Sequence, residues 1–80
     1  MVNNMSRYVI NKDDGSEIAY GFDHAVGYFF QKFETDEDGN EVVTIDLDRL
    51  NSSRGDVLAK MIDFGVPHEH VEATALDLPF

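Results

Sequence analysis

The chain has 80 residues and no cysteine, so it is long enough for one domain and has no disulfides to stabilise it. Sixteen acidic residues against six basic ones give a formal net charge of −10 at pH 7. A chain of this charge repels nucleic acid and anionic membranes, and its natural partners are basic surfaces. No apolar run approaches the roughly 20 residues of a membrane span, so we expect a cytoplasmic protein without a signal peptide or membrane contact.

The first part of the chain predicts a β-hairpin. Residues 1–6 are expected to be a flexible tail, and residues 7–80 a single α+β domain. Arg7–Asn11 is typical of a strand and Lys12–Gly15 of a turn, because Asp-Gly after an apolar run favours a hairpin. Ser16–Phe22 then returns as a second strand. Its small residues, Ala19 and Gly21, share one face, which predicts that something approaches closely there.

The most apolar stretch, residues 18–33, holds six of the nine aromatic residues, so the core is expected there. Residues 23–27 fit either a loop or a single helical turn capped by Asp23. Tyr28–Glu34 is interpreted as a third strand because glycine and aromatic residues favour it. Three consecutive aromatic residues then imply burial on both faces or one exposed ring. A helix over Ala25–Phe33 remains an alternative, because its apolar residues also recur at helical spacing.

The remaining chain predicts one more strand and two helices. After a turn at Thr35–Asn40, Glu41–Asp48 alternates between a core face and an acidic, solvated face. The expected core face consists of Val43, Ile45 and Leu47; the solvated face consists of Val42, Thr44, Asp46 and Asp48.

Arg54–Phe64 is a predicted helix with a capping box formed by Ser53 and Asp56. Its expected inner stripe is Val57, Leu58, Met61 and Ile62. Gly65 is expected to end this helix, and Pro67 to open a second one at its first-turn position. The second helix would bury Val71, Thr74, Ala75 and Leu78 and end at Pro79. The fold class is therefore α+β: an antiparallel meander of three or four strands against two C-terminal helices.

No pattern of residues names a reaction. His24 next to Asp23 fits acid–base chemistry, but no nucleophile accompanies the pair, so a structural histidine is the preferred interpretation. The acidic turn that begins at Glu34 resembles a calcium loop, but its twelfth position, which should be glutamate, is Ile45. We therefore expect no enzyme activity, no metal and no cofactor.

The acidic residues are the remaining functional feature. Seven of them fall within the second predicted hairpin: Glu34, Asp36, Glu37, Asp38, Glu41, Asp46 and Asp48. Alternate residues of a strand lie about 6.6 Å apart on one face, so Asp46 and Asp48 should form a spaced pair that the turn acids extend into a row. Such a row resembles the charge pattern of a nucleic-acid backbone. It would occupy the basic groove of a partner and exclude the real ligand.

In size, acidity, lack of cysteine and α+β pattern, the chain resembles the small anti-CRISPR proteins of phages and mobile elements. Several of those act as DNA mimics on CRISPR effectors. The resemblance implies an inhibitor whose partner is a basic nucleic-acid-binding protein such as a CRISPR effector subunit, without direct contact to nucleic acid. That class shares no sequence motif, so no residue role is carried over.

The alternative function is a structural or dimerisation domain, in which acidity serves solubility. Its interface would be the exposed part of Tyr20–Phe33, because aromatic side chains dominate interface energetics. The protein is accordingly expected to be a monomer or a homodimer.

Overall fold

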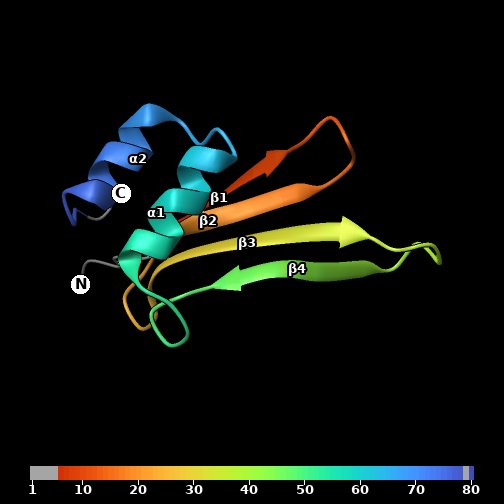
Figure 1. The fold of residues 1–80 in the computed structure, drawn as a ribbon, viewed down its shortest axis with the longest axis horizontal. Coiled ribbons are helices and arrows are strands. Elements are labelled where there is room, and N and C mark those ends of the chain that lie inside the picture. The colour runs from red at the N-terminus through yellow and green to blue at the C-terminus, as the bar shows by residue number, and fades with distance from the viewer. Residues whose placement is uncertain (1–5, 79) are drawn as a thin grey trace.

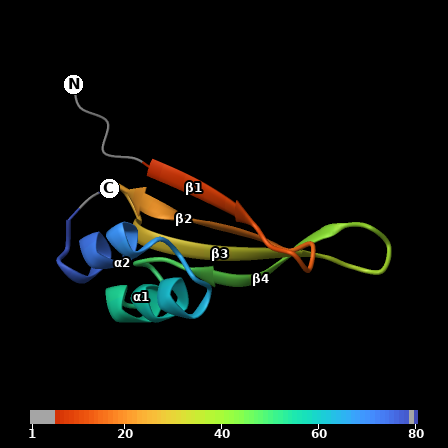
Figure 2. The ribbon, with the colours of Figure 1, turned by 90° about the horizontal axis from the view of Figure 1, so that it is seen from above.

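The computed structural model describes residues 6–78 and 80. Its elements follow in the order β1 (Ser6–Asn11), β2 (Glu17–Asp23), β3 (Gly27–Thr35), β4 (Glu41–Leu47), α1 (Arg54–Asp63) and α2 (His68–Ala75). The strands form one antiparallel sheet in the order β1-β2-β3-β4, and both helices lie on one side of it (Figures 1 and 2). The predicted α+β meander with two C-terminal helices is confirmed. Of the expected tail, residues 1–5 lie outside the described part, and Ser6 is the first residue of β1.

The core lies between the sheet and the helices. Tyr8 pairs with Tyr20, Tyr20 with Phe30, and Phe30 with Leu47, so one row of large apolar side chains crosses all four strands. The buried cluster that these strands share with the helices comprises Ile18, Tyr20, Tyr28, Phe30, Val57, Met61 and Val66. In the part of the chain that the structure describes, no helix is long and apolar enough to cross a membrane.

The aromatic stretch is a strand, so the alternative helix over Ala25–Phe33 is wrong. Residues 23–27 form the tight turn between β2 and β3, in which the Asp23 carboxylate accepts the N–H of Ala25 at 2.7 Å. The three consecutive aromatic residues alternate across the sheet, as strand geometry requires. Tyr28 and Phe30 are buried beneath the helices, whereas Phe29 is half-buried on the opposite side, here called the open face.

The regular alternation expected for β4 is interrupted by a bulge. Lys32 pairs with Ile45 but Phe33 pairs with Val43, so Thr44 is an extra residue in β4. Val43 therefore lies on the open face with Phe33, and its side chain is 51% exposed. Its predicted place in the core is wrong, because one inserted residue reverses the face of every residue beyond it.

The close approach predicted at Gly21 is confirmed. A Cβ atom placed on Gly21 would lie 2.1 Å from the backbone oxygen of Ser6 and 3.2 Å from Cα of Arg7. Only a residue without a side chain lets β1 begin beside β2 in this way.

Both helices have well-defined ends. The predicted capping box of α1 is present, since Ser53 Oγ accepts the N–H of Asp56 and the Asp56 carboxylate accepts the N–H of Ser53. Gly65 follows α1 with φ +74°, as predicted. Pro67 precedes α2 as its N-cap, not as its first-turn residue.

The expected inner faces of the helices are only partly correct. On α1, Val57 and Met61 are buried, but Ile62 is exposed. Helix α2 ends at Ala75, earlier than expected, so Ala75 and Leu78 are exposed while Thr74 is buried. The predicted ending at Pro79 lies outside the described residues.

Candidate functional site

The β3–β4 hairpin extends well beyond the two helices, along the longest axis of a molecule measuring 41 × 24 × 23 Å (Figures 1 and 2). Residues 33–48, which include its turn, contain seven of the sixteen acids and none of the six bases. Residues 33–48 therefore carry seven of the ten net negative charges of the chain, and four of these lie at the protruding tip.

Four of the predicted acids lie at the tip of this hairpin and are exposed: Asp36, Glu37, Asp38 and Glu41. The Asp36 carboxylate accepts backbone N–H groups of Asp38 at 2.9 Å and Asn40 at 2.8 Å. Gly39 supplies the left-handed conformation that the turn needs, with φ +85°. Asp36 therefore shapes the turn, while its three acidic neighbours have no such structural task among the described contacts.

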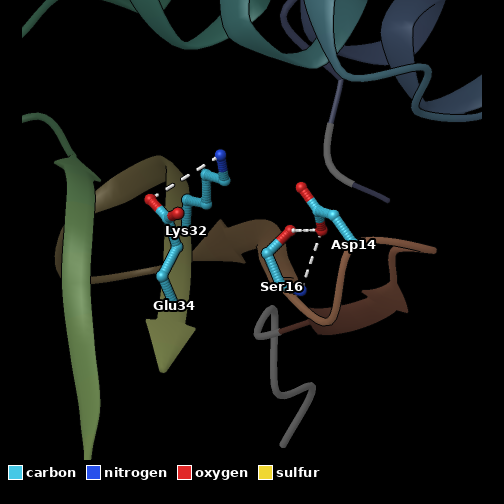
Figure 3. A network of polar contacts seen from close by, with 4 residues as sticks. All are labelled: Asp14, Ser16, Lys32 and Glu34. Atoms are coloured by element: carbon cyan, nitrogen blue, oxygen red, sulfur yellow. Dashed lines mark hydrogen bonds and ion pairs between the residues drawn. The ribbon is translucent and has the colours of Figure 1, made fainter. Parts of the chain in front are cut away.

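Glu34 is half-buried and lies on the helix side of the sheet. Figure 3 shows its carboxylate turned toward Lys32, with Nζ and Oε2 separated by 3.8 Å. The same view shows the neighbouring β1–β2 turn, where the Asp14 carboxylate accepts the hydroxyl and the N–H of Ser16. These two hydrogen bonds lower the pKa of Asp14 below its ordinary value.

Asp46 and Asp48 lie toward the other end of β4. Asp46 is on the open face, where Gln31 Nε2 donates to its carboxylate at 3.3 Å. Asp48 follows the last residue of β4, so the predicted strand is one residue too long, and its carboxylate accepts the N–H of Leu50 at 2.8 Å. Glu41 and Asp46 are five residue steps apart along β4, which is about 17 Å in a strand. Of the seven acids, four form a group at the tip, Asp46 and Asp48 lie near the base, and Glu34 is on the helix side beside Lys32, so the expectation of one continuous row is wrong.

The aromatic residues meet a histidine that sequence reasoning left unassigned. Tyr20 Oη lies 2.6 Å from Nδ1 of His70, and the Tyr8 and Phe80 rings, which also contact each other, lie 4.4 Å and 4.9 Å from the His70 ring. Burial raises the pKa of Tyr20, and the nearby Tyr8 and Glu69 add to this. His24, the histidine predicted to be structural, is instead exposed in the β2–β3 turn. No local pattern could reveal the pairing, because 50 residues separate Tyr20 from His70.

Within residues 6–78 and 80, no group of three or more histidine or acidic side chains is arranged to hold a metal ion. No protein-family model, curated protein or solved structure matches the chain. Its function is therefore inferred from its own charge distribution and geometry.

Proposed function

We propose that this protein is a non-enzymatic binding protein whose acidic β3–β4 hairpin enters the basic nucleic-acid-binding groove of a partner and inhibits it. The observation that carries the proposal is the concentration of charge. Seven acids and no base occupy residues 33–48, and four of these acids lie at the hairpin tip, which protrudes beyond the helices (Figure 1). All six bases lie elsewhere in the chain, so none interrupts the negative surface of the tip.

Hydrogen bonds fix the backbone of the turn that carries the tip acids. The two hydrogen bonds that Asp36 accepts, together with the backbone bond from Asp36 N–H to the Asn40 carbonyl, hold the turn. A preorganised group of carboxylates loses little conformational freedom on binding. Its field also steers a basic partner toward the tip before contact, which raises the association rate at low salt.

The resemblance to small acidic anti-CRISPR proteins supplies the first partner to test. A CRISPR effector holds nucleic acid in a positively charged channel, which is a surface of the required sign and shape. Occupation of that channel by the hairpin would exclude the DNA, and the protein itself would make no contact with nucleic acid.

The decisive experiment compares two triple variants that change net charge equally. One variant neutralises the tip, with Glu37→Gln, Asp38→Asn and Glu41→Gln, and keeps the turn-forming Asp36. The matched control carries Asp13→Asn, Asp63→Asn and Glu72→Gln. All six positions are exposed. Capture of a CRISPR effector from a bacterial lysate, competition by DNA and the salt dependence of binding are measured for each protein.

We expect the tip variant to bind at least about tenfold more weakly and with a shallower salt dependence, while the control binds as the parent does. Equal weakening by both variants would show that net charge alone drives binding. Intact inhibition by the tip variant would disprove the proposed role of the hairpin.

The open face of the sheet supports a second candidate, a homodimer. Val9 and Val43 are 45% and 51% exposed there, and Phe29 and Phe33 are half-buried beside them. Sedimentation at two concentrations tests this function. If the protein is a dimer through this face, Val43→Lys should dissociate it, whereas Leu50→Lys in the loop after β4 should leave it intact. A monomer at both concentrations would reject the dimer.

A further inference from the structure

A cavity of about 320 Å³ lies on the far side of the molecule from the hairpin tip, between the β2–β3 turn, the loop after β4 and the beginning of α1. Its apolar wall consists of the Phe22 and Tyr28 rings, whose centroids are 5.0 Å apart at an angle of 66°. Its polar wall contains Arg49 and Arg54. The volume is at the lower limit of pockets that hold small organic ligands, so it admits a single ring with one polar substituent.

The cavity is lined by positively charged side chains, although the protein as a whole is strongly acidic. Two of the six bases line it, together with a single carboxylate, that of Asp77. Arg49 Nη2 donates to the Ala25 carbonyl at 2.7 Å, which fixes the guanidinium at the cavity wall. Arg54 Nη1 lies 3.1 Å from the Asp77 carboxylate. Guanidinium groups held in this way favour carboxylate and phosphate ligands.

The N-terminus of α1 opens into the same cavity. Its N-cap Ser53 and its first residue Arg54 are both part of the lining, and the helix is ten residues long. The capping box uses the N–H of Asp56 and places the Asp56 carboxylate at this end of the helix. The N–H groups of Arg54 and Gly55 and the helix dipole are what remain to attract an anion. The free N–H groups and the helix dipole, like the two arginines, favour binding of an anion in the cavity.

The cavity lining also contains a buried hydroxyl group without a hydrogen-bond partner among the described residues, that of Tyr28. The side chain is 7% exposed. Burial raises the pKa of Tyr28 to about 12, and the nearby Asp77 carboxylate adds to this through its negative charge and as the closest acceptor for the hydroxyl, while Arg54 opposes the shift. The geometry of that contact does not meet the criteria of a hydrogen bond. The hydroxyl therefore keeps its proton and faces the ion pair at the cavity wall. An unpaired buried donor reduces stability, and an incoming anion would satisfy it.

We propose that this cavity binds a small aromatic anion, a single ring that carries one carboxylate or phosphate group. The ring lies against Phe22 and Tyr28, and the anionic group is received by Arg49, Arg54 and the N-terminus of α1. The ligand competes with Asp77 for Arg54 and accepts a hydrogen bond from the Tyr28 hydroxyl. This site is separate from the acidic hairpin and does not depend on the function proposed for it.

Binding is tested with four probes: benzoate, phenyl phosphate, benzyl alcohol and inorganic phosphate. Calorimetry and backbone amide shifts are followed on the whole chain at fixed ionic strength. Benzoate and phenyl phosphate should bind and shift the amides of Gly27 and Ser53, and their relative affinity identifies the preferred anion. Benzyl alcohol lacks the charge and inorganic phosphate lacks the ring, so both should bind at least tenfold more weakly. Absence of binding by both aromatic anions at millimolar concentration, or equal binding of benzyl alcohol, would overturn the proposal.

Variants that are expected to lower or to raise the affinity for the anion identify the cavity residues that bind it. Tyr28→Phe keeps the ring and removes the unpaired hydroxyl, so the free protein should be at least as stable while anion affinity falls about tenfold. Arg49→Gln should also lower affinity about tenfold. Asp77→Asn removes the competing charge and should raise affinity several-fold. Lys60→Gln, a cation outside the cavity, is the control and should change nothing.

A ligand whose affinity is unchanged by Tyr28→Phe and Arg49→Gln binds somewhere else. A fall in affinity with Asp77→Asn would contradict the competition for Arg54. Either result rejects the proposed arrangement.

Discussion

The hydroxyl of Tyr20 lies 2.6 Å from Nδ1 of His70, and this hydrogen bond joins the second strand of the sheet to helix α2. Tyr20 is 1% exposed, so little water is available to replace the bond. The His70 ring also packs against Tyr8 of β1 and against Phe80, and these two rings contact each other. This side-chain contact therefore attaches α2 to the sheet.

Replacement of Tyr20 by phenylalanine should lower the free energy of unfolding by about 1–2 kcal/mol. The change keeps the ring and its burial, but it removes the hydroxyl and leaves Nδ1 of His70 without this partner. Urea denaturation followed by circular dichroism measures the effect. Tyr8→Phe is the control, because Tyr8 is partly exposed and its hydroxyl can bond to water, so its effect should stay within about 0.5 kcal/mol. Equal effects of the two variants would contradict a stabilising role for the Tyr20–His70 bond.

Two glycine-to-alanine changes should have opposite signs. At Gly21 the new Cβ would lie 2.1 Å from the Ser6 oxygen, so β1 must move and we expect a loss of several kcal/mol. At Gly55, in the first turn of α1, the nearest atom is Ser53 Oγ at 3.6 Å, which is ordinary contact. There alanine should stabilise by about 0.5 kcal/mol, because it restricts the unfolded chain and favours the helix. Thermal unfolding of both variants measures the difference, and a neutral Gly21→Ala would show that the close approach is not obligatory.

The features that local sequence could predict are those set by neighbouring residues. The Asp-Gly turns, the capping box of Ser53 and Asp56, and the glycine that follows α1 each depend on a few consecutive residues, and each is present. The extra residue Thr44 could not be predicted, because a bulge depends on how two strands pair and not on either strand alone. That one residue is why Val43 lies on the open face.

In the candidate sites too, features set by neighbouring residues could be predicted and features set by the fold could not. The acidity of the β3–β4 turn can be read from consecutive residues, but the distribution of its acids over a tip and a base depends on the turn and on where β4 ends. The cavity could not be predicted, because it brings together Tyr28, Arg49, Arg54 and Asp77 from four different parts of the chain. Asp77 has φ +60°, a conformation uncommon for residues other than glycine, and only the fold shows the arginine beside it.

Removal of the Ser16 hydroxyl should change the titration of one carboxyl group. Hydrogen bonds from the side chain and backbone of Ser16 lower the pKa of Asp14. A lowered pKa in the folded state stabilises the protein above the ordinary value of 3.8, and this contribution is lost as the pH falls through the folded-state value. In Ser16→Ala the Asp14 pKa should rise toward its ordinary value, as measured by nuclear magnetic resonance of the carboxyl carbon. The Asp56 pKa, lowered by Ser53, is the internal control and should not change.

Alkaline unfolding should reveal the buried hydroxyl of Tyr28. Its pKa is about 12 in the folded protein, against 10.0 for an ordinary tyrosine. Below pH 10 both states keep the proton, so this group adds no pH dependence. Between pH 10 and 12 only the unfolded state releases it, and the free energy of unfolding should fall by about 1.4 kcal/mol per pH unit.

The comparison with Tyr28→Phe isolates this contribution, because Tyr20, whose pKa is also raised, is present in both proteins. We expect the variant to lose stability less steeply above pH 10 in urea denaturation series. Parallel curves for the two proteins would mean that the hydroxyl ionises as readily in the folded state as in the unfolded one. A saturating aromatic anion should extend the alkaline loss to higher pH in the parent protein only, since the bound anion adds a negative charge beside the Tyr28 hydroxyl and makes its ionisation in the folded state still less favourable.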